Sequence, residues 1–182
     1  MPDATGLELI AQELRERDAE SVLDTLYFRD KSVLTVSASS IRETLEHLRG
    51  KGFNFLASVH GVDYFPEEPR LGVHYELLDM YEVDRMTVKV RVPLDTPHVP
   101  SVVADWPTAD HQEREVYDMF GVVFDGHPDL RRILMPEDYE GHPQRRDFPL
   151  GGEPVLFTQQ QAHGTDYTLG VDRPHAGSET PQ

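Results

Sequence analysis

The sequence predicts an α+β fold. We expect a two-layer sandwich, with helices on one face of a mostly antiparallel or mixed sheet of about five strands, followed by an extended C-terminal docking segment. Three observations predict this: segments in the order α, β, β, α, β, β, β, strands that alternate apolar and polar residues, and a composition change near Phe124. A doubly wound fold would need more helices and continuously apolar strands.

Two early helices are predicted from capping residues and apolar periodicity. Thr5 and Glu8 have the spacing of a capping box, and Ser40 and Glu43 repeat it. Apolar residues then recur at helical spacing after each box. We expect these helices at residues 6–17 and 40–50.

The strands are predicted from alternation with a period of two. The clearest run extends from Met86 to Val92, where Thr87, Lys89 and Arg91 separate the apolar residues. A polar loop at residues 29–31 suits a hairpin between the first two strands. We expect strands at residues 21–28, 32–36, 55–59, 73–77 and 86–92.

A third helix is expected at residues 110–120. Asp110 and Glu113 have the spacing of an acidic capping box, and Gly121 is a natural C-terminal residue. Arg114 can pair with Asp118 one turn later. One face then carries Glu113 beside Val116, Tyr117 and Phe120. We expect the core domain to span residues 1–124 and to end with this helix.

Charge and cysteine content exclude several classes of function. The net charge of −16 in 182 residues repels phosphate backbones and anionic lipid headgroups. Without cysteine, the chain has no thiolate ligands for zinc or an iron–sulfur cluster. The sequence also has no Gly-x-Gly-x-x-Gly motif and no phosphate-binding glycine loop with lysine. We therefore expect no cofactor, no nucleic acid partner, no membrane insertion and a position on the cytosolic side.

Residues 125–182 have a different composition from the core. This segment holds 7 of the 14 prolines and 7 of the 13 glycines, with only scattered large apolar residues. Too few apolar residues are available to offset the entropy of ordering the chain. We expect an extended tail that binds a partner and is ordered by that partner's surface.

Two near-copies of one motif occur in this tail. Gly126-His127-Pro128-Asp129-Leu130-Arg131-Arg132 and Gly141-His142-Pro143-Gln144-Arg145-Arg146-Asp147 each place paired arginines after a His-Pro step. Arginine forks bind carboxylates well, so each copy could be a clasp on an acidic partner. The alternative is a metal or acid–base site made by His127, His142 and nearby aspartates, which are Asp129, Asp138 and Asp147.

The segment from residue 113 onward resembles a known family. Glu113-Arg114-Glu115-x-x-Asp118-Met119-Phe120, followed by His127, Arg131 and Ile133-Leu134, is similar to the signature of the thirty-kilodalton subunit of respiratory complex I. The similarity extends over most of residues 52–150. The residues that we expect at a docking surface are Glu113, Arg114, Glu115, Asp118, Phe120, His127, Pro128, Arg131, Arg132, His142, Pro143, Arg145, Arg146 and Asp147.

The resemblance implies a peripheral-arm subunit of a proton-translocating NADH:quinone oxidoreductase. In that family the electrons pass from NADH to quinone through other subunits, so it implies no catalytic, cofactor-binding or metal-binding residue in this chain. The implied partners are the D subunit, which holds the quinone site, and the B and I subunits, which carry clusters. The implied location is peripheral, on the cytoplasmic side of the cell membrane.

Two alternatives remain open from the sequence. The first is the equivalent subunit of a complex I-like membrane-bound hydrogenase or coenzyme-F420 dehydrogenase. The second, from another class, is a small metal-dependent hydrolase that uses the histidines and aspartates of the tail.

Overall fold

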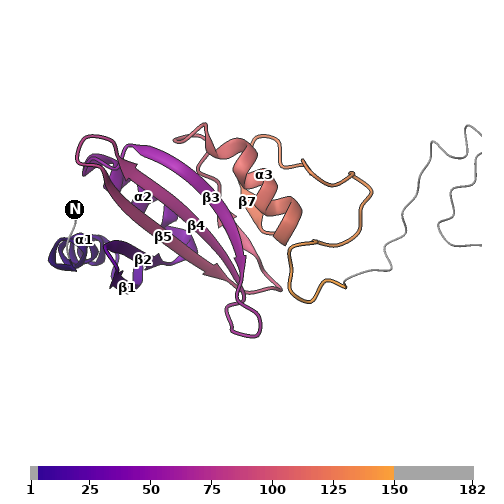
Figure 1. The fold of residues 1–182 in the computed structure, drawn as a ribbon, viewed down its shortest axis with the longest axis horizontal. Helices are drawn as coiled ribbons and strands as arrows, with labels where there is room; N and C mark the ends of the chain where they lie inside the picture. The colour runs from indigo at the N-terminus through magenta and orange to yellow at the C-terminus, as the bar shows by residue number, and fades with distance from the viewer. Residues whose placement is uncertain (1–3, 150–182) are drawn as a thin grey trace, which may run out of the picture. The chain divides into compact units, whose positions relative to one another are not determined.

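The computed structural model describes residues 4–149, and it has the predicted α+β architecture (Figure 1). The chain up to Phe148 forms one compact unit. The elements in chain order are α1 (Ala4–Arg17), β1 (Val22–Phe28), β2 (Lys31–Val36), a 3-10 turn (Ala38–Ser40), α2 (Ile41–Gly50), β3 (Phe55–Asp63), β4 (Leu71–Asp79), β5 (Asp84–Val92), β6 (His98–Pro100), α3 (Ala109–Phe120) and β7 (Val123–Asp125).

Five strands form one mixed sheet in the order β1-β2-β5-β4-β3. The pairs β1/β2, β5/β4 and β4/β3 are antiparallel, whereas β2 and β5 run parallel. The parallel pair arises because α2, β3 and β4 lie between β2 and β5 in the sequence. The edges of the sheet are therefore β1 and β3.

One face of the sheet carries the hydrophobic core. Met86, Val88, Val90 and Val92 of β5 are buried there, and the alternate residues of β2 and β4 join them. Helix α1 contributes Leu7, Ile10, Ala11 and Leu14, and α2 contributes Ile41, Leu45 and Leu48. Figure 1 shows α2 behind the sheet, so these helices form the second layer.

The α3 region is built on a small second sheet. β6 and β7 pair in parallel, with Val99 beside Phe124, and both of these residues are buried. Sequence patterns miss these two strands because each has only three residues. Trp106 anchors the loop between β6 and α3 with 6% exposure, and the Arg49 guanidinium lies 5.1 Å from the centre of its ring.

The helix bounds are close to the prediction, but the three predicted capping boxes are wrong. Thr5 lies inside α1, which begins at Ala4. Ser40 precedes α2 without a side-chain cap, and its hydroxyl lies 2.6 Å from the Ser37 hydroxyl. Thr108 precedes α3, also without a side-chain cap.

No helix within residues 4–149 is both long enough and apolar enough to cross a bilayer.

Candidate functional site

Residues 126–148, which we call the strap, lie against α3 and the loop after β3. This differs from the expectation that the whole tail is ordered only by a partner, because α3 itself supplies hydrogen bonds and ion pairs for the strap. Residues 150–182 lie outside the described residues. The predicted boundary between a core domain (residues 1–124) and a tail (residues 125–182) stays a prediction.

The strap satisfies the C-terminal carbonyl groups of α3, which lack partners inside the helix. The Tyr117 carbonyl accepts from the Gly121 N–H at 2.8 Å, where Gly121 adopts a φ of 77°. The remaining three carbonyls are bound by the strap. His142 Nδ1 donates to Asp118 O at 3.0 Å, Gln144 N to Met119 O at 3.1 Å, and Arg145 Nε to Phe120 O at 2.7 Å.

This end of α3 carries the negative pole of the helix dipole, so the arginines of the strap also match its charge. Burial lowers the pKa of His142, and neighbouring arginines lower it further, so the imidazole stays neutral while its Nδ1–H donates to the helix. The C-terminus of α3 thus fixes the path of the strap, while burial and the arginines set the direction of the shift in the pKa of His142.

Asp118 is the second anchor of the strap. Its buried carboxylate accepts three consecutive backbone N–H groups, from Ile133, Leu134 and Met135, at 2.7–3.0 Å. Arg132 Nη1 donates to the other oxygen at 2.7 Å, and its Nη2 donates to Gly141 O at 3.0 Å. The predicted pair of Asp118 with Arg114 does not form.

These donors determine the ionisation of Asp118. Burial alone would raise the pKa of its carboxyl, but the three N–H groups and Arg132 outweigh burial and hold the pKa below its usual range. The geometry turns the apolar run after Arg132 outward. Leu134 is 61% exposed and Ile133 is 38% exposed.

A third anchor joins the strap to the loop after β3. Arg70, with 4% exposure, binds Asp63 through Nε at 2.8 Å and Nη2 at 2.7 Å. The same guanidinium binds the Asp147 carboxylate at 2.6 and 2.8 Å. Asp63 also accepts from the Arg146 N–H at 2.8 Å, so its pKa lies well below its usual range, chiefly because of Arg70. Of this group, sequence reasoning identified Asp147 and Arg146 but missed Asp63 and Arg70.

Glu113 holds the start of the α3 region from inside the protein. Its side chain is fully buried and accepts from Ser101 Oγ at 2.7 Å and from the Val102 N–H at 2.8 Å. It therefore ties α3 to the loop after β6, and it is not the capping residue that the sequence suggested. Burial raises the pKa of Glu113, although these two hydrogen bonds oppose the rise.

Two substitutions of Glu113 should separate the contribution of its side-chain shape to stability from that of its charge. Glu113→Gln keeps an acceptor for the Val102 N–H, so we expect the free energy of unfolding at neutral pH to change by less than about 1 kcal/mol. Glu113→Ala leaves that N–H unpaired beside a cavity and should cost about 2–4 kcal/mol. Urea unfolding of both variants gives these values.

The same variants predict a pH dependence. A raised pKa in the folded state means that the contribution of Glu113 to stability is present below the unfolded value of about 4.3 and is lost as the pH rises. The stability of the wild type relative to Glu113→Gln should therefore fall from pH about 4 toward neutrality. A difference that grows over that interval would contradict the assignment.

His127 fastens the beginning of the strap to the beginning of α3. Its Nδ1 accepts from the Asp129 N–H at 3.0 Å, so the proton lies on Nε2, which donates to Asp110 O at 3.2 Å. The imidazole side chain is fully buried, and Asp110 Oδ1 lies 3.4 Å from Nε2. The two near-copies of the motif thus place one histidine at each end of the same helix.

The other predicted site residues have less central positions. Arg114 donates to the carbonyls of Arg131 and Arg132 at 3.2 and 3.3 Å. Arg131 pairs with Asp129 at the surface, at 2.8 Å. Glu115 and Pro128 are exposed, and Pro143 is half-buried. Residues 131, 132, 145 and 146 therefore all have partners within the chain.

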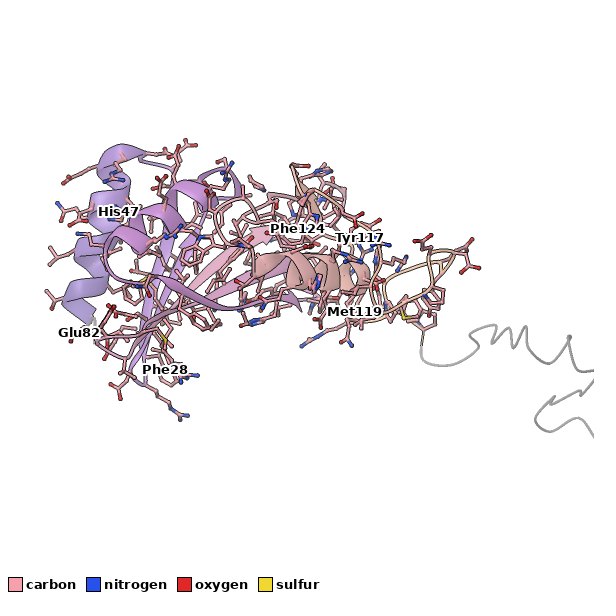
Figure 2. The ribbon with its side chains drawn as sticks, turned by 90° about the horizontal axis from the view of Figure 1, so that it is seen from above. Phe28, His47, Glu82, Tyr117, Met119 and Phe124 are labelled. Atoms are coloured by element: carbon pink, nitrogen blue, oxygen red, sulfur yellow. The ribbon has the colours of Figure 1, made fainter. Side chains whose placement is uncertain are left out.

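Phe120 packs on the backbone of β3 at Gly61. A Cβ atom at position 61 would collide with the Phe120 ring. The groove beside this contact, with a volume of about 520 Å³, lies between β3 and α3 and reaches Met119 and Leu134. Figure 2 shows Tyr117 and Met119 at the opposite end of the described chain from His47 and Glu82.

Gly61→Ala should destabilise the contact between β3 and α3. Overpacking at a helix–sheet contact costs about 1–3 kcal/mol. The matched control is Gly50→Ala at the end of α2, where a Cβ atom would meet nothing within 4 Å, and this change should be neutral or slightly stabilising. Thermal unfolding of both variants tests the contact, and equal effects would contradict it.

The histidines and aspartates of the strap do not converge. Within residues 4–149, no three histidine or acidic side chains form a group that could hold a metal ion. His127 and His142 bind opposite ends of α3, and Asp147 is held by Arg70. The described residues therefore offer no ligand set for the metal-dependent hydrolase considered above.

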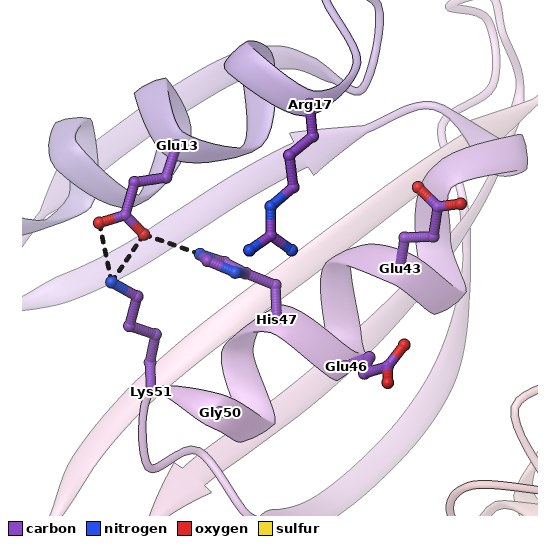
Figure 3. Close-up of a pocket in the computed structure, with 7 residues that line it drawn as sticks. All are labelled: Glu13, Arg17, Glu43, Glu46, His47, Gly50 and Lys51. Atoms are coloured by element: carbon purple, nitrogen blue, oxygen red, sulfur yellow. Dashed lines mark hydrogen bonds and ion pairs between the residues drawn. The ribbon is translucent and has the colours of Figure 1, made fainter.

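A second hollow, between α1 and α2, contains charges of both signs (Figure 3). Glu13 bridges His47 and Lys51, at 2.9 and 2.6 Å. Arg17 and Glu43 also line the hollow. The bridge links the two helices, with His47 on its buried side and Lys51 on its exposed side, and its mixed charge favours no ligand.

The fold and the site define a two-layer α+β domain whose last helix is secured by an ordered strap at its C-terminus. Residues 34–154 match the family model described as the respiratory-chain NADH dehydrogenase, 30 Kd subunit. Because this match covers more than half of the chain, the protein belongs to that family.

Sequence relatives agree with this family. The chain is 53% identical over 150 residues to the C subunit of NADH-quinone oxidoreductase from Saccharopolyspora erythraea, covering 79% of this chain and 60% of the relative. It is 43% identical over 155 residues to the C subunit of the same enzyme from Roseiflexus sp., and the match covers 84% of this chain and 89% of that relative. The chain thus spans about three fifths of the first relative's length and nearly all of the second's.

Solved structures share the fold. The trypsin-resistant fragment (1-134) of Nqo5 matches with a TM-score of 0.58 and 35% identity, over 68% of this chain and 98% of the fragment. A chain of the membrane-bound sulfane sulfur reductase, an archaeal respiratory membrane complex, matches with a TM-score of 0.65 and 25% identity. This match covers 91% of this chain and 96% of that one.

Proposed function

We propose that this chain is a peripheral-arm subunit of a proton-translocating NADH:quinone oxidoreductase and carries no cofactor itself. Its role is to dock onto the D subunit, which holds the quinone site, and to keep that site in shape. Family membership supports the type of complex, and the names of the sequence relatives support the electron donor and acceptor.

The docking role rests on one observation, which is that Asp118 holds the strap with its apolar residues facing outward. One buried carboxylate binds three successive N–H groups, and two exposed apolar side chains follow from that geometry. Exposed apolar side chains on a rigid support are typical of the central contacts of protein interfaces. Ile133 and Leu134 would enter the partner, while the arginines of the strap maintain its shape.

This proposal gives the predicted site residues an indirect role. Arg132, Arg145 and Arg146 already bind groups of their own chain, so they would act as positioning residues for the docking surface. Glu115 and Pro128, both exposed, remain available to the partner. The B and I subunits, which carry clusters in the family, would be further neighbours, and the chain would sit on the cytoplasmic side of the membrane.

A second candidate is supported by the structural match to the sulfane sulfur reductase complex. The chain would then be the equivalent subunit of a complex I-like membrane assembly, such as a hydrogenase or a coenzyme-F420 dehydrogenase. The docking role would be the same, and only the electron donor or acceptor would differ.

Purification of the tagged chain from detergent-solubilised membranes tests the proposal. We expect stoichiometric recovery of the quinone-site subunit, and we expect deletion of the chain to abolish NADH:quinone reductase activity of the membranes. Recovery with hydrogenase or sulfur-reductase subunits would favour the second candidate. Recovery of the chain alone, with membrane activity intact after deletion, would contradict both.

A further inference from the structure

The face of the five-stranded sheet opposite α1 and α2 carries an apolar and basic corner. Strand pairing aligns Phe28 with Lys31 and Arg85 with Leu78, and it aligns Leu78 with Phe55. The parallel register of Ser32 with Met86 brings Lys31 next to Arg85. These five residues therefore form one row across the sheet, on the face that the helices leave open.

This row is exposed and apolar at both ends. Phe28 is 59% exposed and Phe55 is 45% exposed, and Leu26 in the next row is 50% exposed. The adjoining turn between β4 and β5 adds three more exposed apolar residues, so six of the eleven large apolar side chains exposed in residues 4–149 lie at this end. Those six are Leu26, Phe28, Phe55, Met80, Tyr81 and Val83. Figure 2 shows Phe28 and Glu82 at the same end of the ribbon, away from Met119.

Two cations lie in the middle of the row. Within the described part of the chain, neither Lys31 nor Arg85 has an ion pair or a side-chain hydrogen bond, and both side chains are exposed. They line a hollow of about 460 Å³ that extends to Ser58, Thr87 and Glu76. The Glu76 carboxylate in this hollow already accepts from the Thr87 hydroxyl, at 2.9 and 3.0 Å, whereas the two cations have no such partner in the part of the chain that the structure describes. Arginines elsewhere, such as Arg70 and Arg132, are bound by carboxylates. A contiguous exposed apolar patch is typical of an interaction site, and here two cations without a partner in residues 4–149 lie inside one.

We infer that this corner of the open sheet face is a second docking surface, and that its occupant is an amphipathic helix of a partner protein with Asp or Glu beside its apolar stripe. A helix suits the surface because the other face of the same sheet is already covered by helices, and a second helical layer would bury the apolar row. Carboxylates flanking the stripe would pair with Lys31 and Arg85.

Charge argues against the other occupants. In a two-fold contact whose axis passes through the middle of the row, Lys31 and Arg85 of one copy would face the same cations of the other. A nucleic acid is repelled by the net charge of the chain. A flat bilayer of anionic headgroups would meet the exposed carboxylates of Asp24 and Glu82 as well as the two cations, whereas a helix can place its few acidic side chains at the cations alone.

Site-specific photo-cross-linking tests the inference in cells that produce the full chain. p-Benzoylphenylalanine in place of Phe28 should cross-link to a co-assembled protein, and mass spectrometry should place the cross-link on a helix that carries Asp or Glu. The double variant Lys31→Glu, Arg85→Glu should reduce this cross-link by about tenfold. The matched control, Arg15→Glu with Arg17→Glu on α1, makes the same change in net charge and should leave it unaltered.

Each other outcome would overturn the inference. These outcomes are a cross-link to a second copy of this chain, no cross-link, an unaltered cross-link in the double variant, or binding of the purified chain to vesicles of phosphatidylcholine and phosphatidylglycerol through this face. The same photo-cross-linker at position 134 reports on the strap separately. A cross-link from 134 without one from 28 would leave the proposed function standing and remove only this second surface.

Discussion

Replacing Arg70 with methionine should lower the free energy of unfolding by about 3–5 kcal/mol. Methionine fills much of the space of the arginine stem but leaves the Asp63 carboxylate, whose side chain is 2% exposed, without its cation. It also releases Asp147 and with it the end of the strap. Urea unfolding monitored by circular dichroism measures the loss.

The control for this change is Arg42→Met. Arg42 pairs with Asp105 at 2.8 Å, but both side chains are about half exposed. A surface pair of this kind contributes less than about 1 kcal/mol. If both substitutions cost the same, the buried network does not stabilise the fold as described.

The effect of Arg70 should also depend on pH in a defined direction. Arg70 holds the pKa of Asp63 below its usual range in the folded chain. The stability that this ionised carboxylate contributes is therefore present above the unfolded value of about 3.9 and is lost as the pH falls. The difference between wild type and Arg70→Met should narrow below pH about 4.

Asp118→Asn should destabilise the strap and the chain together. The amide oxygen cannot accept from three N–H groups and Arg132 at once, and the amide hydrogens would face those donors. We expect a loss of about 3 kcal/mol in the free energy of unfolding. Exchange of the backbone amide hydrogens of residues 133–135 should accelerate by more than the loss in the free energy of unfolding explains.

The control here is Asp129→Asn. Asp129 pairs with Arg131 at 2.8 Å, but its side chain is 57% exposed, so the change should cost less than about 1 kcal/mol. Unchanged exchange at residues 133–135 in Asp118→Asn would show that the carboxylate does not hold this part of the strap.

Much of the fold could be predicted because its signals are local. The helix over residues 110–120 and the strand over residues 86–92 follow from periodicity, and the structure has them within a residue or two. The parallel pairing of β2 with β5 carries no local signal, because it depends on how α2, β3 and β4 cross over. The family resemblance and the α+β class are confirmed.

The candidate site was predictable in its residue types but not in its connections. The sequence paired Glu113 with Asp110 and Asp118 with Arg114 on the same helix, yet both carboxylates are buried, because loops outside the helix bring N–H donors to them. Asp63 and Asp147 both bind Arg70, although they lie far apart in the sequence. Asp63 also accepts from the backbone N–H of Arg146, which is 83 residues away. Pairing rules for neighbouring helix positions cannot anticipate such contacts.

The most direct test of the docking role is assembly of the Leu134→Glu variant, with Leu9→Glu as its control. Both leucines are similarly exposed, at 61% and 58%, and Leu9 lies on α1. Burying an unpaired carboxylate in an interface is costly, so Leu134→Glu should leave the fold stable but reduce co-purification with partner subunits by about tenfold or more. Leu9→Glu should assemble like the wild type. Normal assembly of Leu134→Glu, or equal loss in both variants, would contradict the role of the strap as a docking surface.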